Sequence, residues 1–276
     1  MQNKVWFITG ISSGLGKALA QVVIESGDHV IGTFRKKEQV EAFNLKHGKN
    51  GTGIQLDISN MAAIERQVEF VRSTFGKIDV LVNNAGVGIA GAIEETSLEE
   101  TRQVFEVNFF GTLKLTQAIL PLMREQGKGH IIQVSSHAGV KAFAGFGIYN
   151  ASKFALEGFS EALAQEVKPL GITVTIVEPG PFRTSFAGRS LLLAQNIIED
   201  YQDTAGAFRN KLLSVHDKQE GDPIKAAHII YDYTQAENQP LRLALGTIPL
   251  KTIKMKIDSL TDDLKQNETL SKKAVY

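Results

Sequence analysis

Tyr149 and Lys153 are the two residues whose types and spacing most directly suggest catalysis. They lie four positions apart at the start of a predicted helix, and residues at this spacing share one helix face. The pKa of a tyrosine hydroxyl is ordinarily about 10, and a neighbouring ammonium group favours the anionic form. Tyr149 is therefore a candidate general acid and base toward a carbonyl or alcohol oxygen. The same spacing also occurs on ordinary helix surfaces, so its interpretation depends on the surrounding sequence.

Ser136 and Asn108 are two further candidates. Ser136 follows the predicted strand His130–Val134, thirteen positions before Tyr149, and its hydroxyl could donate a hydrogen bond to a developing alkoxide. The adjacent Ser135 is the competing candidate, although it could serve only to satisfy backbone groups. Asn108 lies inside a long helical pattern, where asparagine tends to distort the backbone unless it has a role. The alternative for Asn108 is a hydrogen-bonded buried amide.

A glycine-rich loop follows the predicted strand Val5–Ile8 and leads into a helical segment. Glycines permit a tight turn and the close approach of a pyrophosphate, and the following helix offers unpaired N–H groups with partial positive charge. We expect a dinucleotide phosphate here, although the loop alone could be a simple strand-to-helix turn. The residues assigned to this contact are Gly10, Ile11, Ser12, Ser13, Gly14, Leu15 and Gly16.

The end of the next predicted strand, His29–Thr33, indicates which dinucleotide binds. An NAD-preferring protein usually has an acidic residue here, which contacts the ribose 2′-hydroxyl. This chain instead has Phe34 followed by Arg35, Lys36 and Lys37. Guanidinium and ammonium groups bind phosphate oxygens strongly, so Arg35 predicts a 2′-phosphate and hence the cofactor NADP. The lysines could equally belong to a solvated helix start.

Further short motifs follow the glycine loop in a fixed order. They are Asn83-Asn84-Ala85-Gly86, Asn108, Ser136, Tyr149-Asn150-Ala151-Ser152-Lys153, and Pro179-Gly180 with Thr184. Each motif alone is common in proteins, whereas the order and spacing of all of them together are highly specific. From about residue 4 to residue 184 the chain resembles the short-chain dehydrogenase/reductase family. The resemblance implies hydride transfer between nicotinamide and an alcohol or carbonyl carbon. The catalytic residues would be Asn108, Ser136, Tyr149 and Lys153.

The resemblance also implies roles around the cofactor. Lys153 would hold the nicotinamide ribose, Asn108 would hold a water that links Lys153 to solvent, and an oxidised nicotinamide would help to lower the pKa of Tyr149. Asp57 could alternatively cap the helix that begins near Met61, and the Asn-Asn-Ala-Gly motif could be only a turn. The implied cofactor contacts are Asp57 and Ile58 at adenine, Asn84, Ala85 and Gly86 along the channel, and Pro179, Gly180, Phe182 and Thr184 toward the nicotinamide.

Short apolar runs alternate with longer segments of helical periodicity, which predicts an α/β fold with a doubly wound parallel sheet of Rossmann type. Ligands of such a sheet bind beyond the carboxyl ends of its strands. The expected strands are Val5–Ile8, His29–Thr33, Gly53–Gln55, Val80–Val82, His130–Val134, Thr173–Val177 and Arg242–Leu245. The expected helical segments are Gly16–Ser26, Met61–Phe75, Leu98–Gln126 and Ala151–Pro169.

We expect one domain over residues 1–276, because no repeat or linker divides the chain. Residues 185–223 interrupt the alternation of strands and helices with a segment of helical spacing at Leu191–Tyr201. An irregular segment at the ligand edge of the sheet is typical of a substrate lid. Lys251–Leu264 has the pattern of a closing amphipathic helix, followed by a frayed polar tail. For these carboxyl-terminal pieces the plainer expectation is packing against the domain.

Composition excludes several classes of function. The chain has 30 Lys and Arg and 30 Asp and Glu, so no net field draws it toward nucleic acid or an anionic membrane. The absence of cysteine excludes disulfides, thiolate metal sites and a cysteine nucleophile, and fits a cytoplasmic protein. No apolar stretch approaches the roughly 20 residues that span a bilayer. The histidines lack metal-ligand spacing, so no catalytic metal is expected.

The substrate is expected to be a lipophilic small molecule. Three apolar segments, Val87–Ile93, His137–Ile148 and the region from Phe182 onward, predict a pocket for an aldehyde, ketone or alcohol, although they could equally be core. The resemblance suggests a homodimer or homotetramer. One alternative is an epimerase or dehydratase on the same fold, which usually has a different glycine loop and a larger carboxyl-terminal domain. The other is an NADPH-binding regulator without turnover, against which the four intact catalytic residues argue.

Overall fold

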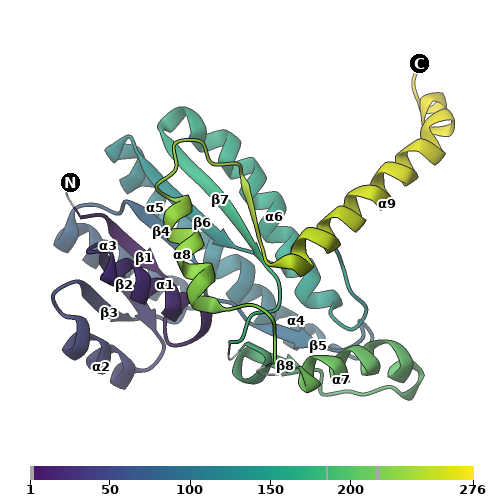
Figure 1. Cartoon of the computed structure of the whole chain (residues 1–276), viewed down its shortest axis with the longest axis horizontal. Coiled ribbons are helices and arrows are strands. Elements are labelled where there is room, and N and C mark those ends of the chain that lie inside the picture. Colours follow the sequence, from purple (N-terminus) through teal and green to yellow (C-terminus); the bar gives the residue numbers. More distant parts are fainter. Residues whose placement is uncertain (1–2, 185, 216–217) are drawn as a thin grey trace.

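Seven parallel strands form one sheet in a computed structural model that describes residues 3–184, 186–215 and 218–276 (Figure 1). Their order is β3-β2-β1-β4-β6-β7-β9, and all seven coincide with the strands expected from the apolar runs. This confirms the doubly wound α/β fold. The strands are β1 Val5–Ile8, β2 His29–Phe34, β3 Gly51–Gln55, β4 Val80–Asn83, β6 Gly129–Val134, β7 Ile172–Pro179 and β9 Arg242–Leu245.

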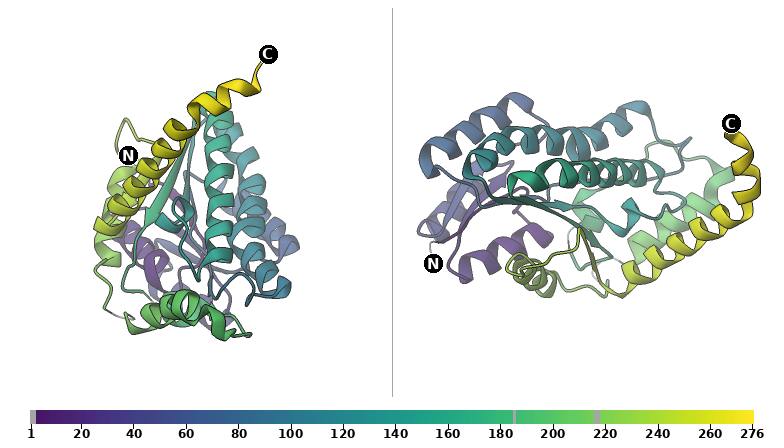
Figure 2. Two further views of the ribbon diagram at one scale, coloured as in Figure 1. Left: turned by 90° about the vertical axis from the view of Figure 1, so that its right-hand side faces the viewer. Right: turned by 90° about the horizontal axis from the view of Figure 1, so that it is seen from above.

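Helices cover both faces of the sheet, as the view along its edge shows (Figure 2). Strand β1 illustrates why, because Val5 and Phe7 join the core beneath α3, α5 and α6, whereas Trp6 and Ile8 join the core beneath α1 and α8. A strand buried on both faces needs the continuous apolar run seen in the sequence. The helices are α1 Gly14–Glu25, α2 Lys37–His47, α3 Met61–Phe75, α4 Leu98–Phe105, α5 Thr112–Gln126, α6 Gly147–Val167, α7 Ala207–Ser214, α8 Pro223–Tyr233 and α9 Thr247–Ser271.

A second, two-stranded sheet corrects one expectation from the sequence. Leu191–Leu193 forms strand β8, which pairs in parallel with strand β5, Gly88–Ala90. The expected helix over Leu191–Tyr201 is therefore wrong, because backbone partners distant in sequence outweigh the local apolar spacing. Short 3-10 and π turns follow at Glu199–Tyr201 and Gln202–Gly206.

Helix α9 corrects a second expectation. It runs from Thr247 to Ser271, well beyond the expected end, and projects away from the body of the molecule (Figures 1 and 2). Every residue of α9 from Ile257 onward is exposed. Packing against the domain is thus confined to its first turns. Within the described ranges no helix is long and apolar enough to cross a membrane.

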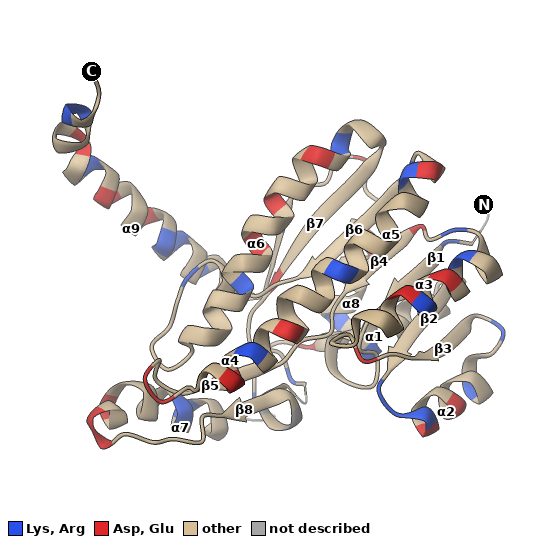
Figure 3. Ribbon diagram, turned by 180° about the vertical axis from the view of Figure 1, so that it is seen from behind, with Lys and Arg blue, Asp and Glu red and all other residues tan. Residues whose placement is uncertain are grey.

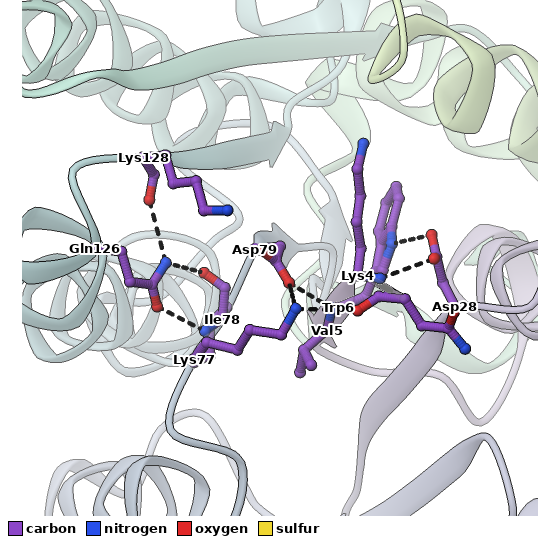
Figure 4. Close-up of polar contacts among 10 residues, drawn as sticks. Lys4, Val5, Trp6, Asp28, Lys77, Ile78, Asp79, Gln126 and Lys128 are labelled. Carbon is purple, nitrogen blue, oxygen red and sulfur yellow. Dashed lines mark hydrogen bonds and ion pairs between the residues drawn. The ribbon is translucent and has the colours of Figure 1, made fainter. Parts of the chain in front are cut away.

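Polar side chains fix the amino ends of the central strands, at the edge opposite the carboxyl ends (Figure 4). Asp28 accepts hydrogen bonds from Lys4 N at 2.9 Å and from Trp6 Nε1 at 3.0 Å. Asp79 accepts a hydrogen bond from Val5 N at 2.8 Å and lies 2.8 Å from the Lys77 ammonium group. These two carboxylates therefore position the start of β1 against its neighbours.

A partly buried charge cluster joins the far edge of the sheet to α6. The Arg242 guanidinium of β9 lies 2.8 Å from Glu157 and 2.7 Å from Glu161, both on α6, and 2.9 Å from Glu178 on β7. Burial is the main cause that raises the pKa of Glu178 to about 7, and the charge of Glu157 adds to the rise while Arg242 opposes it. Three carboxylates thus share one guanidinium.

Replacing Asp28 by Ala should lower the free energy of unfolding by about 1–3 kcal/mol, because the buried Trp6 indole N–H loses its acceptor. Urea unfolding followed by circular dichroism measures this value. Glu25→Ala, which removes an exposed carboxylate of α1, is the control and should change it by less than about 0.5 kcal/mol. Equal losses in the two variants would contradict the assignment.

Replacing Glu178 by Gln should change how stability depends on pH. A carboxyl whose pKa is higher in the folded than in the unfolded chain stabilises the fold below the unfolded value and loses that contribution as the pH rises through about 7. Glu178→Gln should therefore gain roughly 2–3 kcal/mol relative to the wild type between pH 4.5 and pH 8. Chemical unfolding at both pH values measures the gain, and parallel curves would refute it.

Candidate active site

The glycine loop lies at the carboxyl end of β1 and adopts a shape that requires glycine. Gly10 and Gly14 have φ of +69° and +59°, in the left-handed region. A Cβ on Gly16 would lie 2.3 Å from Asn84 Nδ2 and 2.7 Å from the Gly10 carbonyl oxygen. A side chain at Gly16 would therefore displace the backbone that the loop has to present.

The amino end of α1 is open to an anion. Ser13 precedes the helix without making a side-chain capping bond within the described chain, and the first turn carries no acidic residue. The N–H groups of this turn are thus available to a phosphate. Thr184 lies beside the same turn, because a Cβ on Gly14 would be 3.3 Å from Thr184 Cβ. These residues fit the diphosphate of a dinucleotide.

The Asn-Ala-Gly motif after β4 is bonded to the glycine loop. Asn84 Nδ2 donates to the carbonyl oxygens of Thr9 at 2.8 Å and Gly10 at 3.2 Å. Thr9 Oγ1 accepts from the backbone N–H groups of Asn84 and Ala85, each at 2.9 Å. The motif therefore stabilises the glycine loop, which agrees with the alternative that it is a structural turn. It also lies next to the loop at which the resemblance expects the cofactor.

Two sequence-predicted cofactor positions lie at the ends of β2 and β3. Arg35 is exposed just beyond β2, and Gln55 holds its carbonyl oxygen at 3.0 Å. Asp57 accepts hydrogen bonds from Ser59, while α3 is capped by Asn60. The expectation that Asp57 might cap this helix is therefore wrong, and the buried Ile58 follows it in the core.

The positions expected at the nicotinamide end follow the carboxyl end of β7. The Gly180 N–H donates to the Leu245 carbonyl oxygen at 3.0 Å, directly after Pro179. Phe182 then pairs with Gly221 in an isolated bridge. This segment leads to Thr184. The structure therefore brings the residues expected at the nicotinamide to the same edge of the sheet as the glycine loop.

Asn108 interrupts the long helix expected over Leu98–Gln126. A π-helix at Glu106–Gly111 separates α4 from α5, and such bulges are frequent at functional sites. The Asn108 amide accepts from Val87 N at 2.9 Å and donates to Val87 O at 2.8 Å and to Ser152 Oγ at 2.9 Å. The Asn108 amide is buried and hydrogen-bonded, as the alternative of a structural amide requires. It also lies beside Lys153, where the resemblance expects it.

Lys153 lies beside Gly86, where the resemblance expects the cofactor. Its ammonium group donates to the Val134 carbonyl oxygen at 2.9 Å. A Cβ on Gly86 would lie 3.4 Å from Asn108 Oδ1 and 3.6 Å from Lys153 Nζ. Burial lowers the pKa of Lys153 to about 8, and the charge of Glu157 opposes this shift. The ammonium group therefore lies beside Gly86, with the Glu157 carboxylate one helical turn away.

Tyr149 lies next to two other candidates, Lys153 on α6 and Ser136 just after β6. Its ring centroid is 5.9 Å from Lys153 Nζ. Burial raises the pKa of Tyr149 to about 12, and a hydrogen bond with Ser136 works in the opposite direction. In the protein alone the expected lowering is therefore outweighed by desolvation. Ser136 Oγ also accepts from Ala138 N at 3.1 Å, whereas Ser135 is directed toward Glu157.

An aromatic cluster covers Tyr149. The Phe146 and Phe186 rings lie 4.4 Å and 5.7 Å from the Tyr149 ring, and Phe208 of α7 lies 5.3 Å from Phe146. The sequence indicated Phe146 and Phe186 for an apolar pocket but missed Phe208. Its only signal was the apolar character of residues 207–213. His137 packs against Phe143 and bonds to Thr252 of α9.

Two buried carboxylates that the sequence analysis missed fasten the segment over the cluster. Glu95 accepts hydrogen bonds from Ala92 N at 2.8 Å and Ile198 N at 2.9 Å, and Glu100 accepts from Gln195 N at 3.0 Å. Ser97 and Glu100 form a local capping box that the sequence could have indicated, whereas the bonds to Gln195 and Ile198 join segments about a hundred residues apart and leave no local signal. Among the described residues, no group of three His, Asp or Glu side chains could hold a metal ion.

Comparisons with known proteins agree with this geometry. The family model described as short chain dehydrogenase matches residues 4–191. The chain is 39% identical over 253 residues to the 3-ketodihydrosphingosine reductase of Bacteroides thetaiotaomicron, covering 90% of each chain. It is 38% identical over 245 residues to oxidoreductase BOA17 of Botryotinia fuckeliana, covering 88% of this chain and 89% of that protein.

A solved structure extends the likeness to the whole molecule. The crystal structure of a short-chain dehydrogenase from Streptomyces avermitilis superposes with a TM-score of 0.92 at 40% identity, covering 99% of this chain and 100% of the other. The chain therefore belongs to the short-chain dehydrogenase/reductase family of oxidoreductases, which act on alcohol and carbonyl groups.

Proposed function

We propose that the protein is an NADP(H)-dependent oxidoreductase that interconverts an alcohol and a carbonyl group on a lipophilic small molecule. The observation that carries the proposal is the position of Tyr149. It lies beside Ser136 and Lys153, at the inner end of the cradle formed by the glycine loop and the Asn-Ala-Gly motif. A proton donor next to a dinucleotide site is the arrangement that carbonyl reduction needs.

The chain's own residues manage the proton and orient the reacting oxygen. When bound, the nicotinamide would supply or accept the hydride. Tyr149, with a pKa of about 12 in the protein alone, is protonated at neutral pH and begins a reduction as the acid toward the carbonyl oxygen. Ser136 donates a second hydrogen bond to that oxygen. The Lys153 ammonium group favours the tyrosinate that remains, and in the oxidation direction the same groups act in reverse.

NADP is proposed over NAD because of Arg35. Its side chain is exposed at the carboxyl end of β2, next to the loop of β1, and no acidic residue stands at that strand end. A guanidinium group at this place suits the 2′-phosphate of NADP, whereas it has no acceptor for the hydroxyl hydrogens of a free ribose diol. The bound adenosine would extend toward Asp57 and Ile58.

A lipophilic substrate is proposed because the cover of Tyr149 is aromatic. Phe146, Phe186 and Phe208 surround the ring, and Leu191 completes the buried cluster. The relative from Bacteroides thetaiotaomicron is named for a ketone of the sphingosine type, which carries a long alkyl chain. We further propose that residues 185–223 act as the lid of this pocket within a single domain, and that the protein assembles from two or four copies.

Replacing Tyr149 by Phe should lower kcat by about 10²–10⁴-fold while leaving the Kd for NADPH within about twofold, because only the proton donor is lost. The assay is NADPH oxidation with a panel of lipophilic aldehydes and ketones. Tyr233→Phe, at a hydroxyl of α8 that bonds Pro240, is the matched control and should keep full turnover. Tight NADPH binding by the wild type with no turnover on any panel member would favour a regulator over an enzyme.

Replacing Arg35 by Asp should shift the cofactor preference. The carboxylate would repel the 2′-phosphate and accept hydrogen bonds from the ribose of NAD, so the ratio of kcat/KM for NADPH to that for NADH should fall by at least about tenfold. Lys46→Asp, in the exposed last turn of α2, makes the same charge change away from the strand end. A similar fall in both variants would indicate general electrostatics rather than a contact.

A further inference from the structure

Helix α9 has a surface that the rest of the chain does not cover. Its base is fixed, because Thr252 Oγ1 lies 3.1 Å from His137 Nδ1 and Pro249 is buried. Beyond Lys256 the helix is fully exposed and extends away from the body (Figure 2). A helix gains most of its stability from packing one apolar face, so α9 lacks the contact that would stabilise its outer half.

The apolar residues of α9 follow a heptad pattern. Leu250, Ile253, Ile257, Leu260 and Leu264 are spaced by three, four, three and four positions. The outer ones are strongly exposed, with Ile257 at 56%, Leu260 at 46% and Leu264 at 74%. A stripe of two positions in seven is the narrow seam by which one helix packs on another. We call these five residues the α9 seam.

We propose that the α9 seam packs against the α9 seam of a second copy of this chain, with the two helices antiparallel. A two-fold pair is self-complementary, so each contact occurs twice. In the central layers Ile257 meets Leu260 of the second copy, and Ile253 meets Leu264 of the second copy. This pairing buries the exposed leucines and isoleucines on both chains without any change in the body of the protein.

The charges beside the seam select the antiparallel direction (Figure 3). Lys256 and Asp263 flank the seam on one side, and within the described chain neither forms an ion pair. In the antiparallel pair Lys256 lies opposite Asp263 of the second copy, and this contact is formed twice. An in-register parallel pair would instead bring Asp263 beside Glu268 of the second copy, also twice. Opposite charges therefore favour one direction and like charges disfavour the other.

The composition of α9 argues against a lipid surface as the occupant. An interfacial helix has a broad apolar face and a polar face rich in lysine and arginine. The α9 seam is narrow, and the other faces mix lysines with Asp258, Asp262, Asp263 and Glu268 (Figure 3). Anionic lipid would repel these carboxylates, whereas a second copy provides a cation for Asp263.

Cysteine cross-linking tests the pairing directly, because the chain contains no cysteine. Ile253→Cys and Leu264→Cys are made in separate, differently tagged full-length chains, co-expressed and mildly oxidised. The antiparallel pair predicts a disulfide between the two variants in roughly half of the molecules, the share that random pairing makes mixed, and none when either variant is present alone. Met255→Cys, outside the seam on the same helix, replaces Ile253→Cys in the control and should not cross-link. Cross-linking of a single variant with itself, or none in the mixture, would overturn the proposal.

Charge reversal provides a second test that leaves the interior of the helix unchanged. Neither Lys256 nor Asp263 has a charged residue three or four positions away, so the internal ion pairs of α9 are unaffected. Lys256→Asp should weaken the pairing roughly tenfold at low salt, and Lys256→Asp with Asp263→Lys should restore it. Sedimentation equilibrium of full-length protein measures both effects. An unchanged assembly in the single variant, or binding of the wild type to phosphatidylglycerol vesicles through α9, would count against the second copy.

Discussion

The burial of one ammonium group governs the arrangement of the site. Lys153 lies almost wholly inside the protein, where an unpaired charge is costly. The Val134 carbonyl oxygen accepts its hydrogen bond, and Glu157 supplies an opposite charge one helical turn away. Glu157 is in turn held by Arg242, which β9 presents from the edge of the sheet. The last strand of the sheet thus supports a charge at the centre of the candidate site, although it contributes no residue to the site itself.

The bulge at Asn108 connects this charge to the segment after β4. Its amide bonds both backbone groups of Val87 and the Ser152 hydroxyl, so α6 and the chain following Gly86 are held at one distance. A regular helix would turn the Asn108 side chain to a different direction, because a π turn inserts one extra residue. The irregularity is therefore the feature that lets one side chain serve two elements.

The sequence predicts the sheet well because each strand is buried on both faces and needs an unbroken apolar run. It also marks Tyr149, Lys153, Ser136 and the glycine loop as candidates, because their spacings are short enough to be recognised along the chain. It does not predict β8, whose pairing partner lies about a hundred residues earlier, or the carboxylates Glu95 and Glu100, which bond a distant segment. The high pKa of Tyr149 in the protein alone was also missed, because desolvation depends on the aromatic side chains that cover it.

The pairing of β8 with β5 has a mechanical consequence. Leu191–Leu193 is hydrogen-bonded to Gly88–Ala90, and Gly88 follows directly on the residue that Asn108 holds. The segment over Tyr149 is thus part of a backbone ladder rather than a loop held by side chains alone. Displacing it requires peptide hydrogen bonds to break next to Val87. The segment that covers Tyr149 and the segment that Asn108 holds are consequently joined by backbone hydrogen bonds, so a displacement of the first strains the second.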